Sequence, residues 1–377
     1  MTYKTRLLFV IENSAYGGGE KGFSLLIRGL SKERFEVFCA AFPAGRFYEE
    51  TRRHCSFLPL DLTSRFNIGN IGLLKKMMVE NKIDLAHSQG ARADFYCGLA
   101  AARAGVKALA TVQMPVEGFD VSAIKKAAYL FLNSFSEKKL SRVITVSDPL
   151  AALLRKKIPL VDVIPNPVDL AEFSPSNFNA APVIEKYGLR GRLVVGALGR
   201  LEWQKGYCHL ISALALALRK EADLKEKLLC LVAGSGSLEA KLKEQAEKSG
   251  LGGNILFCGE VAEARDFLGA IDIFVMPSLL EGQPLALLEA MAMAKPVVAS
   301  DIPGIAGTAA ADQEALLVPP ADPALLAGAL LRLLHDAEAA ARLGRNARKR
   351  AEAFGLPLFL ERHEAVYAGM TGPGKNG

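Results

Sequence analysis

The chain has 377 residues, of which half are hydrophobic, and it carries six cysteines and a formal net charge of +6. At roughly 100–200 residues per domain, this length predicts two domains. No apolar run reaches the about 18 residues of a membrane-spanning helix, and residues 7–11 form too short an apolar stretch for a signal peptide. The cysteines form no C-x-x-C pair, so we expect a reduced, cytosolic protein without structural zinc.

The excess positive charge lies in the first half of the chain. Residues 1–175 contain 24 Lys and Arg against 17 Asp and Glu, whereas the remainder contains 22 against 23. A basic half can attract nucleic acid, an anionic acceptor or an anionic membrane surface, or it can be an ordinary solvated surface. Nucleic acid is not expected, because the basic residues come with no recognition motif.

Short β-branched runs alternate with longer helical patterns along the chain. The predicted strands of the first half are 6–11, 37–41, 85–87, 108–112 and 142–146, with helices at 21–30, 71–80 and 91–104. After a proline-rich linker at 165–183, strands are predicted at 193–198, 228–233, 255–257, 271–276 and 296–299, followed by two helices within 322–353 and one at 356–368. This alternation predicts an α/β fold with two doubly wound, Rossmann-like domains, residues 1–172 and 185–354.

Open α/β sheets bind ligands at the carboxyl ends of their strands. Two such domains that face each other are expected to hold a ligand in the central cleft between them.

A glycine run, Gly17 to Gly22, follows the first predicted strand and spells G-x-G-x-x-G. A nicotinamide cofactor is not expected, because that fingerprint also needs an acidic residue about 20 positions further on, and the second strand ends without one. We interpret the run as a glycine loop whose backbone can approach a phosphate closely.

A second phosphate element follows the strand 193–198. Arg200 and Lys205 lie five residues apart on a strand-to-helix loop. A guanidinium grips phosphate bidentately and an ammonium adds a point charge. The alternative is a surface ion pair between Arg200 and Glu202. Further on, Ser237 is a reasonable N-cap for the helix after Gly234 and Gly236.

The segment 276–300 gives the strongest indication of function. A helix is predicted to begin at about Pro284, and its free N–H groups and dipole make a site for phosphate. Glu281 and Glu289 flank that site, and they suit hydroxyl groups, which a carboxylate accepts well. A nucleotide-diphosphate sugar supplies both kinds of group. The alternative is that Glu281 only complements the helix dipole and that Glu289 is solvated.

With these residues assembled, the whole chain resembles the retaining glycosyltransferase family 4, of the GT-B fold. The resemblance is strongest from Gly199 to Ser300. The matching positions are Gly17, Gly18 and Glu20, the strand end at 146–147, the segment 164–169, Gly199, Arg200, Lys205, Gly206, Gly259, Val261 and the segment 281–289.

The resemblance implies a role for each matching position. Arg200 and Lys205 would hold the donor diphosphate, and Glu289 would bind the ribose hydroxyls. Gly18 would approach the distal phosphate, and residues 355–377 would cross back to the first domain. The remaining donor-binding positions are Glu281, Gly282, Gln283, Pro284 and Leu285 for the sugar and its phosphate, and Gly259 and Val261 beside the base. Transfer would retain the anomeric configuration and need no metal or other cofactor, in agreement with the absence of a D-x-D pair.

One position departs from the family pattern. Many members have a His after the strand 108–112, where this chain has Gln113. A glutamine can hydrogen-bond a sugar hydroxyl or a phosphate but cannot shuttle a proton at neutral pH. The predicted catalytic residues are therefore Glu281, Arg200, Lys205 and Gln113. We expect Gln113 and His87 on the acceptor side, although a structural role for His87 is an equal alternative.

The acceptor is expected to be a saccharide or a lipid-linked molecule. Residues 122–142 predict a basic amphipathic helix, which can lie on an anionic membrane surface or be an ordinary core helix. The resulting hypothesis is a cytoplasmic, possibly peripheral membrane glycosyltransferase in cell-envelope polysaccharide, lipopolysaccharide or glycolipid synthesis. The alternatives are a nucleotide-sugar 2-epimerase and a non-catalytic nucleotide-sugar-binding protein.

Overall fold

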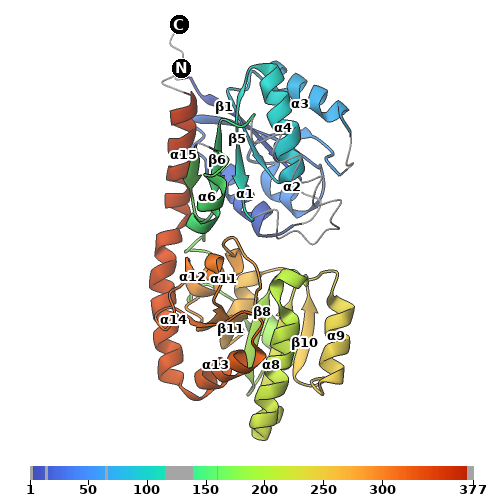
Figure 1. The fold of residues 1–377 in the computed structure, drawn as a ribbon, viewed down its shortest axis with the longest axis vertical. Coiled ribbons are helices and arrows are strands. Elements are labelled where there is room, and N and C mark those ends of the chain that lie inside the picture. Colours follow the sequence, from blue (N-terminus) through green and yellow to red (C-terminus); the bar gives the residue numbers. More distant parts are fainter. Residues whose placement is uncertain (1–2, 13–15, 64–66, 115–138, 159, 372–377) are drawn as a thin grey trace. The chain divides into compact units, whose positions relative to one another are not determined.

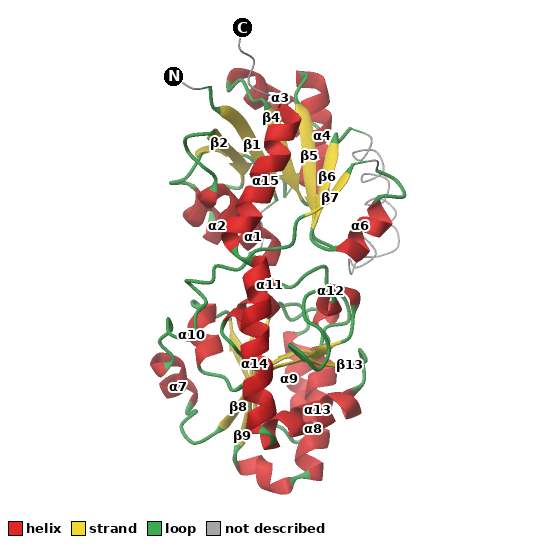
Figure 2. Cartoon of the chain, turned by 90° about the vertical axis from the view of Figure 1, so that its left-hand side faces the viewer, coloured by secondary structure: helices red, strands yellow, loops and turns green. Residues whose placement is uncertain are grey.

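The computed structural model describes residues 3–12, 16–63, 67–114, 139–158 and 160–371. The chain divides into two compact units, one made of residues 1–166 with 356–377 and the other of residues 167–355. Each unit contains one sheet with helices on both of its faces (Figures 1 and 2). The two Rossmann-like domains that the sequence predicts are therefore present.

The first unit is built on seven parallel strands in the order β3-β2-β1-β4-β5-β6-β7. Its strands are β1 (Thr5–Ile11), β2 (Phe35–Ala41), β3 (Ser56–Pro59), β4 (Leu85–Gln89), β5 (Lys107–Val112), β6 (Arg142–Thr145) and β7 (Val161–Val163). Its helices are α1 (Gly18–Gly29), α2 (Gly45–Thr51), α3 (Gly69–Glu80), α4 (Ala91–Ala104), α6 (Asp148–Leu154) and α15 (Leu356–Thr371).

Both faces of the first sheet are covered by apolar side chains. On one face, Phe9 of β1 packs with α1 and with Tyr367 of α15. On the other face, Val10 packs with α3 and α4. Burial on both sides explains why residues 7–11 of β1 are an unbroken apolar run rather than an alternating one. Figure 2 shows α15, the last helix of the chain, lying across this sheet.

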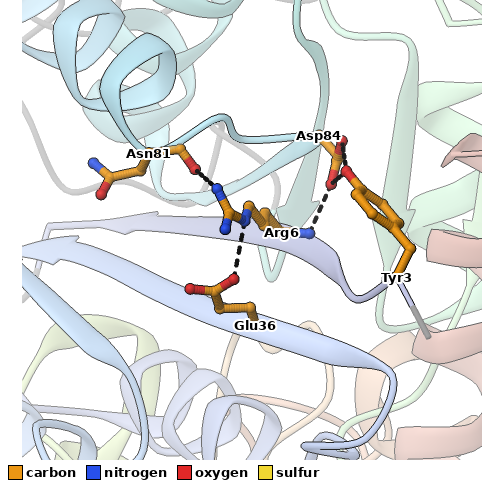
Figure 3. Close-up of polar contacts among 5 residues, drawn as sticks. All are labelled: Tyr3, Arg6, Glu36, Asn81 and Asp84. Atoms are coloured by element: carbon orange, nitrogen blue, oxygen red, sulfur yellow. Dashed lines mark hydrogen bonds and ion pairs between the residues drawn. The ribbon is translucent and has the colours of Figure 1, made fainter. Parts of the chain in front are cut away.

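The amino end of this sheet carries a group of polar contacts (Figure 3). Arg6 and Glu36 are direct partners in the register of β1 and β2, and the guanidinium Nε donates to Glu36 Oε2 at 2.9 Å. Asp84, which precedes β4, accepts from the Arg6 amide at 2.8 Å and from the Tyr3 hydroxyl at 2.6 Å. The Arg6 guanidinium also donates to the carbonyl of Asn81 at 3.2 Å. These contacts fix the alignment of β2, β1 and β4 at the end opposite to their carboxyl termini.

The second unit has six parallel strands in the order β10-β9-β8-β11-β12-β13. Its strands are β8 (Leu193–Leu198), β9 (Leu228–Ala233), β10 (Ile255–Gly259), β11 (Ile273–Met276), β12 (Val297–Ser300) and β13 (Leu316–Val318). Its helices are α7 (Ala181–Tyr187), α8 (Tyr207–Lys220), α9 (Glu239–Lys248), α10 (Ala264–Gly269), α11 (Leu285–Ala292), α12 (Pro303–Ala306), α13 (Pro323–His335) and α14 (Ala337–Ala351). One core lies under α8 and α13, and the other lies under α10, α11 and α14.

Several predicted elements need correction. The strands β3, β7 and β13 are not predicted; each is a short strand at the edge of its sheet. The basic helix predicted over 122–142 falls largely outside the described residues, and it cannot extend to Arg142, which begins β6. Among the residues that the structure describes, no helix has the length and apolar character that a membrane span requires.

Candidate active site

Glu281 is fixed in the loop between β11 and α11 of the second unit. Its Oε1 atom lies 2.6 Å from Lys205 Nζ and accepts a hydrogen bond of 2.7 Å from Ser278 Oγ. The side chain of Glu281 is only 5% exposed and that of Lys205 is 20% exposed. A charged pair held this far from solvent is screened little by water and salt, so its geometry is well defined before any ligand arrives.

Lys205 reaches Glu281 because the loops after β8 and β11 are joined through their backbones. The Leu279 amide donates to the Gln204 carbonyl at 2.7 Å. Gly206 follows with a φ of +63°, and a Cβ atom there would lie 2.0 Å from the carbonyl oxygen of Pro277. Only glycine fits this left-handed position without strain, so the close approach of the two loops depends on it.

Arg200, on the same loop as Lys205, is exposed. It has no ion pair with the described residues, so the predicted alternative of a pair with Glu202 is wrong. Glu202 instead accepts from the Ser237 amide at 3.0 Å and from its hydroxyl at 2.7 Å. Ser237 is therefore not an N-cap, and α9 begins two residues later at Glu239. The Arg200 guanidinium is available to an anion.

Glycines bring the ends of β8, β9 and β10 together. A Cβ atom on Gly234 would lie 2.0 Å from the carbonyl oxygen of Gly199, and the Gly234 amide donates to the Gly259 carbonyl at 2.7 Å. Val261, just beyond β10, is half-buried and packs against the core under α10 and α11. The backbones of the loops after β8, β9 and β10 therefore lie close together beside Arg200.

The helix α11 begins at Leu285, with Pro284 as its N-cap in an extended conformation. The expected helical start at Pro284 is therefore one residue early. Glu289 lies in the second turn and is 4% exposed, which excludes the alternative of a solvated helix residue. Gly282 and Gln283, which lead into the helix, are buried as well. The first-turn N–H groups of α11 and two buried carboxylates thus come from one short segment.

The first unit presents a different set of groups at the carboxyl ends of its strands. Asn166 Nδ2 donates to Gln113 Oε1 at 2.9 Å, and Gln113 Nε2 donates to Gln89 Oε1 at 3.2 Å. Gln89 ends β4, Gln113 follows β5, and Asn166 follows β7. The three amides line a small pocket together with Gly22 and Thr111. We call Asn166, Gln113 and Gln89 the amide chain.

The glycine run from Gly17 to Gly22 is not a loop, as the sequence predicts, but the start of α1. Gly18 is the first helical residue, and the Glu20 side chain accepts from the Gly17 amide at 2.9 Å, which caps the helix. The glycines permit close packing instead, since a Cβ atom on Gly19 would lie 3.0 Å from Gln89 Nε2. Gly18 remains at a helix N-terminus, where an anion is stabilised.

The structure does not support the expected acceptor-side role of His87. The ring is fully buried, with Nδ1 2.7 Å from Tyr367 Oη and Nε2 2.8 Å from Thr111 Oγ1. Burial, together with the nearby His363, holds the pKa of His87 well below its usual value. Its neutral ring joins β4 to α15, so His87 is a structural residue.

Some residues of both sites are not predicted from the sequence. Ser278 supports Glu281, and Gln89 and Asn166 support Gln113. Each is a polar residue within three positions of a strand end, where ligand-binding side chains gather in parallel sheets, and Asn166 also lies in the segment 164–169 that resembles the family. No group of three or more His, Cys, Asp or Glu suited to a metal occurs within the described part of the chain.

Two family profiles cover most of the chain. Residues 183–350 match the profile described as "Glycosyl transferases group 1", and residues 16–172 match "Glycosyltransferase Family 4". The chain is also 31% identical over 245 residues to a lipopolysaccharide core biosynthesis mannosyltransferase, LpcC, of Rhizobium leguminosarum bv. viciae. That match spans 63% of this chain and 67% of the relative. The chain belongs to glycosyltransferase family 4.

A second relative is the UDP-Gal:alpha-D-GlcNAc-diphosphoundecaprenol alpha-1,3-galactosyltransferase of Escherichia coli. It is 31% identical over 242 residues, which span 61% of this chain and 61% of the relative. The chain therefore matches about three-fifths of the length of that protein.

Solved structures support the GT-B fold of this family 4 member. The Anabaena protein HepE in complex with UDP-glucose aligns with a TM-score of 0.84 at 20% identity, over 97% of this chain and 99% of that one. A glycosyltransferase from Rickettsia africae aligns with a TM-score of 0.81 at 21% identity, over 100% of both chains.

Proposed function

We propose that this family 4 member is a retaining glycosyltransferase that moves a sugar from a nucleotide-diphosphate sugar to a hydroxyl acceptor. The observation that carries the proposal is the loop before α11, where Glu281 is held by Lys205 and Ser278 next to a free helix N-terminus. The exposed Arg200 guanidinium follows the neighbouring strand β8. Anion-binding and hydroxyl-binding groups thus occur together, as a nucleotide sugar requires.

Different parts of the donor are proposed to contact different groups of this site, according to their charge. Lys205 is paired with Glu281, so Arg200 and the N–H groups of α11 supply most of the attraction for the diphosphate, and Lys205 adds to it as charge develops on the leaving group. The carboxylate of Glu281 is oriented by two donors on one oxygen, which leaves Oε2 for a hydroxyl of the sugar. Glu289 is the proposed acceptor of ribose hydroxyls, and the backbone around Gly259 and Val261 is proposed to lie beside the base.

In the proposed reaction the acceptor oxygen bonds to the anomeric carbon while the bond from that carbon to the phosphate oxygen breaks. A donor phosphate oxygen takes the proton of the acceptor hydroxyl, on the face from which the phosphate leaves, so the anomeric configuration is retained. Arg200 and Lys205 stabilise the charge on the departing diphosphate. We propose that these two cations take the place of a metal ion, and that no protein nucleophile takes part.

The acceptor is proposed to be a saccharide or lipid-linked hydroxyl in lipopolysaccharide, polysaccharide or glycolipid synthesis. The names of the two relatives, one with a diphosphoundecaprenol acceptor and one in lipopolysaccharide core synthesis, support this class. We further propose a cytoplasmic protein that meets an anionic membrane surface through its basic first half. If the protein does not float with anionic vesicles at low salt, the proposed membrane contact is contradicted.

The donor assignment is tested by a thermal-shift panel of UDP-, GDP- and ADP-sugars, since a ligand of the folded state raises its melting temperature. A shift with one nucleotide class, lost in Arg200→Ala, is the expected result. Radiolabelled donor then separates transfer from the alternatives, because an epimerase releases an epimerised nucleotide sugar and a binding protein gives no turnover. Neither alternative is favoured, since the relatives are transferases.

A further inference from the structure

The amide chain of the first unit has a defined direction. Gln113 accepts from Asn166 and donates to Gln89. If the Gln113 amide were turned over, its NH2 group would meet the NH2 group of Asn166 and its oxygen would meet the oxygen of Gln89. Both hydrogen bonds would be lost, so the two neighbours hold Gln113 in one of its two possible orientations.

Burial restricts the movement of the two outer residues of the amide chain, Asn166 and Gln89. Asn166 is 3% exposed and Gln89 is 6% exposed, whereas Gln113 is half-buried and lines the pocket. The outer amides are packed under α1, with Gly19 against Gln89 Nε2 and Gly22 close to Asn166 Oδ1. The middle amide is therefore the one that a ligand can reach, and the outer ones set which of its atoms faces which neighbour.

We propose that Asn166 and Gln89 are positioning residues that hold Gln113 with one N–H engaged and the other available to an oxygen of the sugar substrate. The inference rests on the proposed function. Nε2 of Gln113 carries two hydrogens, and Gln89 takes one of them; the other has no partner among the described residues. A neutral amide in this place selects an uncharged hydroxyl or a phosphate oxygen by hydrogen bonding and takes no part in proton transfer.

The amide chain has titratable neighbours on α1, β4, α4 and α15. His363 of α15 lines the pocket, and burial lowers its pKa to about 4. His87 of β4 contacts Thr111, and burial holds its pKa well below the usual value. Glu20 of α1 is engaged by the Gly17 amide. Asp94 of α4, which accepts from Ser88 beside Gln89, has a pKa raised by burial to about 7 and changes its charge between about pH 5.5 and 8. Because Asp94 is present in wild type and in every variant, the ratio of variant to wild type at each pH cancels its effect.

The test is the pH dependence of Asn166→Asp relative to wild type. An ionised carboxylate cannot donate to Gln113, but a protonated one can, and burial raises a carboxyl pKa into this range, as at Asp94, where it is about 7. The variant should be about tenfold slower than wild type at pH 8, the effect of one hydrogen bond, and recover most of that loss at pH 5.5. Nucleotide release from UDP-glucose, UDP-galactose or GDP-mannose, with water as acceptor, is the readout.

Gln89→Glu is the matched control, because a carboxylate accepts from Gln113 at any pH. Its ratio to wild type should be independent of pH. A loss in Asn166→Asp that is equal at both pH values, or the same pH dependence in both variants, would overturn the proposal. If Asn166→Asp does not fold, Asn166→Thr, which can donate, should be about tenfold faster than the isosteric Asn166→Val, and equal rates would overturn it.

Failure of the proposed function looks different. If the wild-type protein neither binds nor turns over a nucleotide sugar, the transferase assignment is overturned, and the substrate role of Gln113 with it. If the wild-type protein is active and the Asn166 variants release nucleotide at the wild-type rate, only the positioning role of the amide chain is overturned.

Discussion

The two sheets have the same strand order around their centres, yet the carboxyl ends of their strands present different chemistry. In the second unit these ends carry Arg200, Lys205 and Glu281, with one carboxylate held by two donors. In the first unit the pocket is lined by amides, and its histidine, His363, is neutral through burial. One Rossmann-like architecture thus supports a charged site and a neutral one, which indicates that the loops decide the chemistry.

The largest effect is expected where the charged site is broken. Lys205→Ala and Glu281→Ala should each lower turnover of the nucleotide sugar by roughly 10²–10³-fold, the usual loss when a group that stabilises developing charge is removed. Each change also leaves the partner charge buried and unpaired. Lys248→Ala is the control, because its ion pair with Glu244 is on the surface, with side chains 74% and 61% exposed. If Lys205→Ala turned over the nucleotide sugar at the wild-type rate, the proposed role of Lys205 in the reaction would be wrong.

A second test concerns Asp94, a buried carboxyl group of the first unit that does not line its pocket. Asp94 of α4 is buried and bonded to Ser88, and burial raises its pKa to about 7. As pH rises from about 4 to 7 the unfolded chain loses this proton while the folded chain keeps it, so the free energy of unfolding falls by of order 4 kcal/mol. Above pH 7 this contribution is constant.

Asp94→Asn removes that dependence. The difference in unfolding free energy between wild type and variant, measured by urea denaturation at each pH, should decrease from pH 4 to pH 7. The buried His87 and His363 have lowered pKa values, so their contribution to stability is lost as pH falls from about 6.5, the opposite direction. Because both histidines are present in both proteins, the difference isolates Asp94, and a difference that is constant with pH would contradict its assignment.

The charged site also depends on a left-handed glycine, Gly206, between its two loops. Gly206→Ala should cost roughly 3 kcal/mol or more, since it adds a backbone collision to left-handed strain. Gly188→Ala is the matched control, because Gly188 has a similar φ of +61° but open space around its Cβ position, and it should cost only about 1–2 kcal/mol. Equal melting temperatures for the two variants would show that the loops of β8 and β11 need not approach closely.

The same contrast explains which features the sequence could predict. Strands such as β8 and β9 are predicted to the residue, because a strand buried on both faces is an unbroken apolar run. The edge strands β3, β7 and β13 are not predicted. The strands β3 and β7 are only partly buried, so they do not read as unbroken apolar runs, and β13 has only three residues. The glycine run before Lys21 is misassigned, because the cap formed by Glu20 depends on side-chain geometry.

The sites divide in the same way. Arg200 and Glu281 are found from residue type and position after a strand, because their chemistry is local. The amide chain joins Gln89, Gln113 and Asn166, which come together only when the strand order is known. The burial of His87 likewise follows from α15, which lies 280 residues further along the chain at Tyr367.

The smallest effect is expected at the amino end of the first sheet, where charges serve alignment rather than chemistry. Arg6 and Glu36 form a cross-strand ion pair at 2.9 Å (Figure 3), but their side chains are 33% and 42% exposed. Solvent screening limits such a pair to roughly 0.2–1 kcal/mol. A double-mutant cycle with Arg6→Met and Glu36→Gln separates this coupling from the bond of Arg6 to the Asn81 carbonyl. The coupling should shrink further in 1 M salt, and a salt-independent value well above about 1 kcal/mol would mean that this end of the sheet is electrostatically as sheltered as the Lys205–Glu281 pair.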